Sequence, residues 1–230
     1  MLVTLTEYAK QHYKKVLPRQ EIEVVNNGIV PFSFDEFEID TADVDLLTTL
    51  KQNHEIIMLI GRFDNAKGIE QVFVLLQQNP QLCAVVIGNG KLFDQLQREA
   101  HNKKVSQRFI LLGTRKSAKY YLQFADYFIC PSRSEGFGLV VIEAMCAKVP
   151  VMLSNLPVFK ELFPSTAVTF FELDNPLSIQ KNFLDLKANE DKLINSANKL
   201  FHELYTMHTM FYNYLNNYRK LTNSLINSKV

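Results

Sequence analysis

The sequence predicts an α/β fold with a single Rossmann-like, doubly wound parallel sheet and extra helices at the C-terminal end. Short apolar segments alternate with segments of helical periodicity over most of the 230 residues, which is typical of a parallel sheet with helices on both faces. After Pro176 only helical patterns follow. Glycine and proline number only 8 each, which argues against a disordered or fibrous chain.

The expected strands are short apolar runs that lie between polar turns. They cover residues 2–5, 21–25, 56–60, 82–87, 109–112, 127–130, 149–153 and 168–171. The expected helices cover residues 7–16, 69–78, 91–102, 117–124, 139–147, 182–204 and 207–223. From residue 56 onward strands and helices alternate, which predicts right-handed parallel crossovers.

Residues 26–40 interrupt this alternation. Asn27-Gly28 is a turn signal, and Pro31 follows it. The segment is therefore the best candidate for a linker between domains.

The last expected helix carries an apolar stripe at three- and four-residue spacing. The stripe consists of Met207, Met210, Phe211, Tyr214, Leu215, Tyr218 and Leu221. Such a stripe predicts packing against a core.

The charge balance excludes a polyanion binder that works through bulk charge. Lys plus Arg number 25 and Asp plus Glu number 24, so the formal net charge is +1, and we expect no nucleic-acid partner. The first expected helix is locally basic, with Lys10, Lys14, Lys15 and Arg19 in and after it. A solvated face is the favoured interpretation, and contact with anionic lipid is the alternative.

Cysteine usage and the lack of long apolar runs point to the cytoplasm. Cys83, Cys130 and Cys146 each lie in an apolar run and form no C-x-x-C pair, so we expect buried, reduced thiols. The first ten residues lack the pattern of a signal peptide. No apolar run approaches the ~18 residues that span a bilayer. The expected location is cytoplasmic, with a peripheral position at the inner membrane face as the alternative.

Ligands of open parallel sheets bind at the carboxyl ends of the strands, over helix N-termini. The loop after the strand that ends at Ile60 carries Arg62 and Lys67 between Gly61 and Gly68. Two cations beside a helix start can form an anion site. The alternative is a pair of solvated cations, because the loop lacks the Walker spacing.

A second loop at this edge is Gly88-Asn89-Gly90, which follows the strand that ends at Ile87. It matches part of a dinucleotide fingerprint, but Phe93 occupies the position of the third glycine. A tight turn that needs positive φ explains the glycines equally well.

The third loop runs from Pro131 into an apolar helix. Gly136 and Gly138 allow close approach of a ligand, and the N–H groups of Phe137, Gly138 and Leu139 would form a second anion site at the helix start.

Two acidic residues, Glu135 and Glu143, accompany this loop. Glu143 is the only charge in the stretch LVVIEAMCA, so it lies either at the solvent edge of the helix or as a hydrogen-bond acceptor at the ligand. Carboxylates cannot serve an anion, but they suit neutral hydroxyls such as those of ribose or a hexose.

Several motifs in a fixed order resemble one family, the group 1 retaining glycosyltransferases of the GT-B type. ADYFICPSRSEGFGLVVIEAMCAKVPVM is similar to the family's E-G-F-G-L-x-x-x-E segment, and GRFDNAKGI to its G-R-x-x-x-x-K-G loop. VVIGNGKLFDQL, FILLGTRKSAKYYLQFADYF and NNGI resemble further family segments. The resemblance covers nearly the whole chain, and most of all residues 56–163.

The resemblance implies a site for a nucleoside diphosphate sugar. Arg62, Lys67 and the N–H groups at Gly138 and Leu139 would hold the diphosphate. Glu143 would accept hydrogen bonds from the ribose, and Glu135 from the donor sugar. The backbone near Gly113 and Thr114 would border the base. The expected donor-binding residues are Gly61, Arg62, Lys67, Gly88, Gly113, Thr114, Glu135, Gly136, Phe137, Gly138, Leu139 and Glu143, and those with a catalytic role are Glu135, Arg62 and Lys67.

The chain departs from the family at two places besides its N-terminal end. Lys148 stands where the family usually has a glycine before Val149-Pro150, and the family's glycine-rich segment is missing around residues 165–171. Neither departure removes a ligand group, but both make the donor specificity less transferable.

In this family the acceptor binds mainly to an N-terminal domain, and only about 25 residues precede the linker here. The resemblance therefore implies that residues 1–30 are the remnant of an N-terminal domain with its linker, and residues 31–230 the donor-binding domain. We expect partners in a missing N-terminal half and in other copies of the chain, and no sugar transfer by the chain alone.

Two other functions compete with this one. A non-catalytic nucleotide-sugar-binding or partner subunit of a split glycosyltransferase fits the same motifs. A nicotinamide-binding domain is disfavoured, because the fingerprint is incomplete and no acidic residue ends the strand at 109–112.

We expect neither a metal nor another cofactor. Asp43-Val44-Asp45 is a D-x-D pattern, but acids in a first helical turn with Thr41 as N-cap explain it better than a metal site. The five histidines, His12, His54, His101, His202 and His208, have no metal-ligand spacing.

Overall fold

The computed structural model of the chain describes residues 1–227, with side chains described through residue 222. Its core is a six-stranded parallel sheet with the order β5-β4-β3-β6-β7-β8. The strands are β3 (Glu55–Ile60), β4 (Leu82–Ile87), β5 (Phe109–Gly113), β6 (Tyr127–Cys130), β7 (Val151–Ser154) and β8 (Thr169–Phe171). The strand order reverses between β3 and β6, as in doubly wound Rossmann-like folds. The predicted fold class is confirmed.

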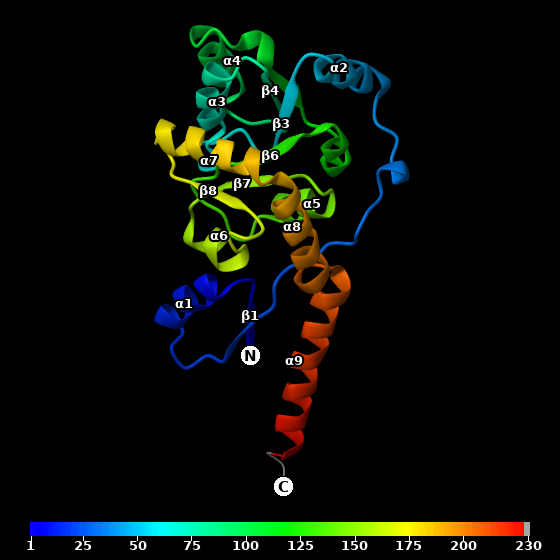
Figure 1. Cartoon of the computed structure of the whole chain (residues 1–230). Coiled ribbons are helices and arrows are strands. Elements are labelled where there is room, and N and C mark those ends of the chain that lie inside the picture. The colour runs from blue at the N-terminus through cyan, green and yellow to red at the C-terminus, as the bar shows by residue number, and fades with distance from the viewer. Residues whose placement is uncertain (228–230) are drawn as a thin grey trace.

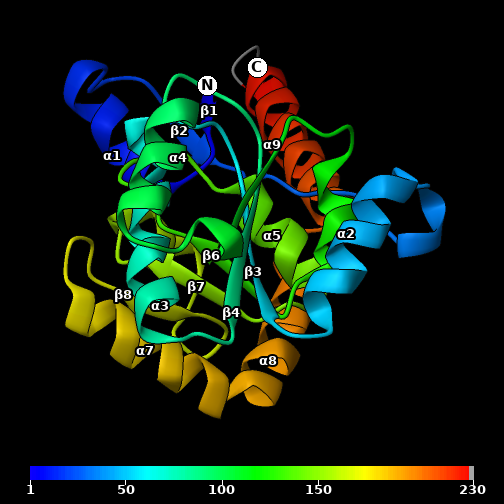
Figure 2. The same cartoon turned by 90° about the horizontal axis from the view of Figure 1, so that it is seen from above.

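Helices cover both faces of this sheet (Figures 1 and 2). One face carries α3 (Val72–Gln78), α4 (Phe93–Asn102) and α7 (Pro176–Ala188), and the other carries α2 (Thr41–Lys51), α5 (Leu139–Cys146), α6 (Pro157–Leu162) and α8 (Glu190–Leu204), which packs against α5. Alternate residues of a strand point to opposite faces. Ile57 and Leu59 of β3 pack with the first group, while Ile56 and Met58 pack with the second.

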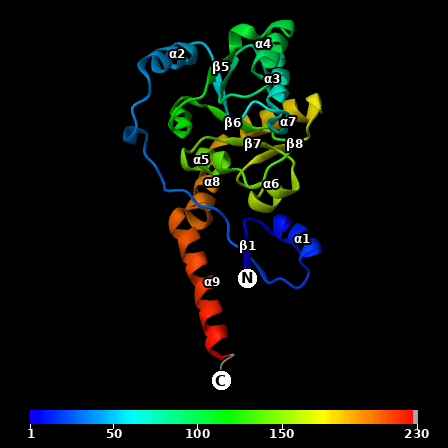
Figure 3. The same ribbon diagram turned by 180° about the vertical axis from the view of Figure 1, so that it is seen from behind.

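The N-terminal residues form a second, two-stranded parallel sheet outside the main one (Figure 3). It consists of β1 (Leu2–Thr4) and β2 (Ile22–Val24), joined by α1 (Glu7–Val16). The N–H groups of Glu7 and Tyr8 donate to the Glu161 carboxylate of α6 at 2.6 and 2.7 Å. A carboxylate is favourable at this position because the start of a helix carries a positive partial charge. These hydrogen bonds attach α1 to α6, and no residue of α1 is buried.

Helix α9 (Met207–Asn227) projects away from the main sheet (Figures 1 and 3). At its start the backbone pairs with the linker: the N–H of Ile29 donates to the carbonyl of Tyr205 at 2.9 Å, and the N–H of Met207 to the carbonyl of Ile29 at 2.8 Å. Much of the expected core stripe is exposed, including Met207, Phe211 (64%) and Tyr218 (59%). The prediction that this stripe packs into a core is therefore wrong for these residues. No helix of the described residues has the length and apolar character to cross a bilayer.

Helix boundaries account for most other corrections. The single helix expected at residues 182–204 is two helices, α7 and α8, which break at Asn189, and α7 begins earlier because the Asn175 side chain accepts from the N–H of Ser178 at 3.1 Å. The N-cap of α2 is Asp40, whose carboxylate accepts from the N–H of Ala42 at 2.9 Å, and not Thr41. Residues Ala118–Phe124 form a 3₁₀ helix, and the short helix α6 was not expected.

The three cysteines are free thiols. Cys83 and Cys130 are buried as predicted, whereas Cys146 is only half-buried. Burial raises the pKa of the Cys83 thiol to about 12 and that of Cys130 to about 11. Both thiols stay protonated at neutral pH, and protonated thiols are poor nucleophiles.

Candidate functional site

The loops that follow β3, β4, β5 and β6 meet at the carboxyl edge of the sheet, where the strand order reverses. The N–H of Gly61 donates to the carbonyl of Ile87, the N–H of Gly88 to that of Gly113, and the N–H of Arg133 to that of Ala66, at 2.9, 2.9 and 2.7 Å. The structure thus brings the predicted site segments together in one hydrogen-bonded cluster. The crevice at such a reversal is where ligands of open α/β sheets bind.

Gly88 allows two of these loops to touch. Its φ is +145°, and a Cβ at this position would lie 1.8 Å from the carbonyl oxygen of Gly61. Only glycine fits such an approach. Close packing of the loops explains Gly88 without any dinucleotide.

Lys67 and Glu135 face each other across the crevice. They form an ion pair between the β3 and β6 loops, and their side chains are 21% and 12% exposed. The Ser132 hydroxyl also donates to Glu135 Oε1 at 3.1 Å. A cation and a carboxylate are therefore held side by side in a largely desolvated position, where each interacts more strongly than in water.

A buried serine pair supports this arrangement from below. The Ser154 hydroxyl of β7 donates to the carbonyl of Ser132 at 2.5 Å, and both serines are fully buried. The carbonyl of Ser132 is thus bonded to β7, while its hydroxyl holds the Glu135 carboxylate. Neither serine was predicted as a site residue, although Ser132 follows a strand end closely.

Arg62 is the exposed cation of the site. Its side chain is 78% exposed, and its nearest charged partner is Asp64, at 3.3 Å from Nη2 to Oδ2. The other oxygen of Asp64 is buried and has no hydrogen-bond partner among the described residues. The exposed guanidinium is accessible to an anion from solvent, but moving it away from Asp64 would leave that carboxylate, whose side chain is 21% exposed, without its cationic partner.

Helix α5 begins at Leu139, directly after the glycine-containing loop. The first N–H groups of a helix have no acceptor within it and carry its positive partial charge. A side chain added at Gly136 would meet nothing within 4 Å, whereas the side chain of Phe137 is buried. The loop thus anchors itself through Phe137 and presents open backbone around Gly136.

Glu143 lies on α5 above this loop and is half-buried. Burial raises the pKa of its carboxyl, and the nearby Lys119 partly opposes this rise. No hydrogen bond to this carboxylate is found among the described residues. Of the two interpretations from the sequence, an acceptor with free capacity fits this position better than a solvent-exposed edge.

Gly113 ends β5 and Thr114 follows it, in a loop that a carboxylate of the D-x-D pattern contacts through Arg115. Asp43 is buried; its carboxylate accepts from Arg115 Nε at 2.5 Å, from Arg115 Nη2 at 2.9 Å and from the Tyr121 hydroxyl at 2.7 Å. These bonds hold the pKa of Asp43 below its usual value, chiefly through Arg115. Asp43 therefore locks the loop of residues 113–116 to α2, and Asp45 remains exposed.

We expect Asp43→Asn to lower the free energy of unfolding by about 1–3 kcal/mol at pH 7, because Arg115 loses a charged partner. A carboxyl whose pKa is depressed in the folded state stabilises it above the unfolded pKa, about 3.9 for Asp, and loses that effect as pH falls through the folded value. The difference from the wild type should therefore shrink below about pH 4. Urea unfolding at a series of pH values checks this.

Asp45→Asn is the matched control, since it removes the same charge from the same helix and should change stability little. Equal losses from both variants would contradict the assigned role of Asp43.

A hollow of about 950 Å³ lies at the opposite edge of the sheet. It is lined by His54, His101, Lys104 and Arg108, among others. The Arg108 guanidinium is occupied by the backbone carbonyls of Leu76, Asn79 and Leu82. Among the described residues no group of three His, Cys, Asp or Glu side chains could hold a metal ion.

Comparison with known proteins agrees with the resemblance in the sequence. Residues 48–200 match the family described as glycosyl transferases group 1. The O-antigen biosynthesis glycosyltransferase WclY of Escherichia coli is 29% identical over 230 residues, which cover 96% of this chain and 61% of WclY. The UDP-Gal:alpha-D-GlcNAc-diphosphoundecaprenol alpha-1,3-galactosyltransferase of Escherichia coli is 24% identical over 193 residues, 78% of this chain and 48% of that protein.

Solved structures share the fold at low sequence identity. A glycosyltransferase from Rickettsia africae superposes with a TM-score of 0.81 at 17% identity, over 96% of this chain and 63% of that one. Anabaena HepE in complex with UDP superposes with a TM-score of 0.81 at 16% identity, over 96% of this chain and 64% of HepE. The chain thus spans less than two thirds of these proteins. The family match covers about two thirds of the chain and includes the loops after β3, β4, β5 and β6, and the chain therefore belongs to the group 1 glycosyltransferases.

Proposed function

We propose that this chain is the nucleotide-sugar-binding half of a retaining glycosyltransferase, which transfers a hexose from a nucleoside diphosphate sugar to a glycan or a lipid-linked acceptor. The observation that carries the proposal is the Lys67–Glu135 pair beside the start of α5. The UDP complex of HepE and the O-antigen role in the name of WclY support the same donor and acceptor classes.

The residues divide the donor between them. The diphosphate carries negative charge that grows as it departs, and Lys67, Arg62 and the first N–H groups of α5 stabilise that charge. Glu135 accepts hydrogen bonds from the sugar hydroxyls. When the donor enters, Lys67 releases Glu135 and binds the phosphate, while Glu135 accepts hydrogen bonds from the sugar. Each of the two side chains therefore keeps a polar partner. No metal or other cofactor takes part in this scheme.

Retention follows in this proposal from attack on the face of the sugar that the diphosphate leaves. Among the described residues of the crevice, the one carboxylate placed at the sugar is Glu135, which is assigned here to the sugar hydroxyls, and this disfavours a covalent intermediate. The proposed location is cytoplasmic, and the lysines of α1 allow at most a peripheral contact with anionic lipid.

The acceptor side of the cleft is proposed to come from an N-terminal domain or subunit. A two-stranded parallel sheet is a small fragment of a fold that is normally covered on both faces. Here α1 has no buried residue, with Tyr8, Tyr13 and Val16 exposed, and Phe211 of α9 is exposed as well. Without a partner these apolar surfaces favour association between copies.

The direct test is calorimetry of the purified chain with uridine, guanosine and adenosine diphosphate sugars. We expect one base to bind with a dissociation constant at or below about 1 mM, which corresponds to about −4 kcal/mol. Binding should persist in EDTA. Lys103→Ala, an exposed lysine on the other side of the domain, should bind like the wild type. Absence of heat and of chemical-shift changes with every nucleotide would refute the donor site.

Glu143→Gln should weaken uridine and UDP by a similar factor, about three- to tenfold, because both lose the same ribose bonds to a charged acceptor. In the wild type, affinity for uridine should fall as pH decreases, at a higher pH than for an ordinary glutamate, since burial raises the pKa of Glu143. The variant should lose this pH dependence.

The control ligand is 2′,3′-dideoxyuridine, which should bind the wild type and the variant alike. If the wild type binds uridine and its dideoxy analogue equally, Glu143 does not hold the ribose.

A further inference from the structure

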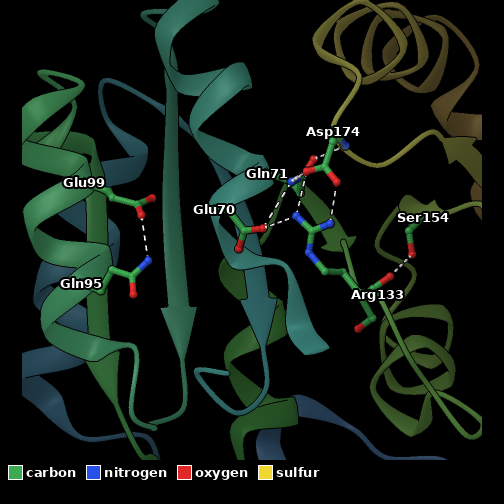
Figure 4. Close-up of polar contacts among 8 residues, drawn as sticks. Glu70, Gln71, Gln95, Glu99, Arg133, Ser154 and Asp174 are labelled. Carbon is green, nitrogen blue, oxygen red and sulfur yellow. Dashed lines mark hydrogen bonds and ion pairs between the residues drawn. The ribbon is translucent and has the colours of Figure 1, made fainter. Parts of the chain in front are cut away.

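Arg133 lies in the β6–α5 loop, two residues before Glu135, and its guanidinium is shared by two carboxylates (Figure 4). Nη1 donates to Asp174 Oδ2 at 2.6 Å and Nη2 to Asp174 Oδ1 at 2.7 Å, which is a bidentate pair. Nη2 also donates to Glu70 Oε1 at 2.6 Å. Bidentate pairs fix the direction of both side chains as well as their separation.

Asp174 is itself held in place by Gln71 (Figure 4). The Gln71 amide donates from Nε2 to Asp174 Oδ1 at 2.7 Å and accepts at Oε1 from the Asp174 N–H at 2.8 Å. Gln71 is buried at the start of α3, with 7% of its surface exposed. The carboxylate that holds Arg133 is thus itself hydrogen-bonded to a buried side chain, although Asp174 is 62% exposed.

The backbone of the same residue touches the other donor loop. The N–H groups of Arg133 and Ser134 donate to the carbonyl of Ala66 at 2.7 and 3.3 Å. Ala66 directly precedes Lys67, and the Arg133 side chain reaches Glu70 three residues after Lys67. Arg133 therefore connects the two loops at points on either side of the Lys67–Glu135 pair.

The charges around Arg133 argue against a role as a phosphate ligand. One guanidinium faces two carboxylates, so its charge is more than balanced within the clamp. An anion would have to displace both partners. The same geometry suits a residue that holds its neighbours.

We propose that Arg133 is a positioning residue: clamped by Asp174 and Glu70, it fixes the β6–α5 loop against the β3 loop so that Lys67 and Glu135 keep the spacing that receives a nucleoside diphosphate. The proposal rests on the proposed function of that pair. The clamp is partly exposed, and exposed ion pairs add little to global stability. Its effect is local.

The first experiment measures amide hydrogen exchange by NMR in the unliganded chain. Arg133→Gln should speed exchange of the amides at 133 and 134 about five- to tenfold and leave β4 unchanged, because only the loop is released. Arg98→Gln removes an exposed arginine from α4 and should change neither. Unchanged exchange at 133 and 134 would overturn the proposal.

Asp174→Asn is a second variant in case Arg133→Gln does not fold. It keeps the shape of the side chain and removes one negative charge from the clamp. It should show the same change in a smaller degree, and the double variant should be no worse than Arg133→Gln. Additive effects of the two substitutions would mean that the residues act separately, against the proposal. The Arg133→Lys variant should not restore slow exchange, because an ammonium cannot bridge three carboxylate oxygens in one plane.

The second experiment titrates UDP at several salt concentrations. Arg133→Gln should weaken binding about fivefold but keep the salt dependence of the wild type, because the lost group does not contact phosphate. A reduced salt dependence would make Arg133 a phosphate ligand and overturn the proposal. If the wild-type chain bound no UDP, the proposed function would fail, while the exchange data would still decide whether Arg133 positions the loop.

Discussion

Replacement of Lys67 by alanine should weaken UDP binding by about 10- to 100-fold, equivalent to ~1.4–2.7 kcal/mol, because a charge-assisted bond to phosphate is lost. The loss has a second cause. Glu135 stays in the crevice at 12% exposure without its partner, and an unpaired, partly buried carboxylate repels the diphosphate. Calorimetry at rising salt should show a shallower salt dependence for the variant than for the wild type, since one fewer cation faces the phosphates.

Glu135→Gln separates the effect of the carboxylate from the effect of the lysine. It removes the negative charge beside Lys67, so UDP should bind as tightly as to the wild type or more tightly. The advantage of a UDP-sugar over UDP should disappear, because the variant loses a charged acceptor for the sugar hydroxyls. Weaker binding of UDP itself to this variant would contradict the assignment of Glu135 to the sugar.

The purified chain should not transfer sugar, and a matching N-terminal half supplied in trans should raise the rate by roughly 100-fold or more, since positioning of the acceptor supplies much of the rate of a bimolecular reaction. Closure of two domains also excludes water from the donor. The measurement is release of the nucleoside diphosphate from the donor sugar that the binding screen identifies, with and without acceptor.

Two observations accompany this experiment. Sedimentation of the chain alone should reveal self-association that the added half suppresses, because both would cover the same apolar surfaces of α1 and α9. Efficient transfer by the chain alone would show that the acceptor site lies within these residues, against the proposal of a half-enzyme.

The strands of the main sheet were predictable because each is apolar on both faces. All six residues of β4 are buried, and the expected and observed bounds of β4 and β6 coincide. Such continuous runs arise only where helices cover both sides. The carboxyl-edge loops followed from the strand ends, so the general place of the site was predictable as well.

Contacts between distant loops were not predictable in the same way. The Lys67–Glu135 pair joins residues 68 apart, and the clamp of Arg133 on Asp174 joins residues 41 apart. Only the packing of the loops determines which cation meets which carboxylate. The prediction that the apolar stripe of α9 packs into a core was wrong for a related reason. Helical spacing identifies an apolar face, but it does not say whether the surface that covers this face belongs to the same chain.

The pairing of Ile29 with the start of α9 has a mechanical consequence. The chain leaves the small β1–β2 sheet through Ile29 and returns toward it through α9, and the two passages are bonded to each other by the N–H and carbonyl of Ile29, at 2.9 and 2.8 Å. The linker and the start of α9 are therefore joined at one residue. Residues 26–28 lie between β2 and Ile29 outside any helix or strand, so they can absorb a rotation of the small sheet without breaking either backbone bond. A displacement of Ile29 itself moves the start of α9 with it, because both backbone hydrogen bonds join this one residue to Tyr205 and Met207.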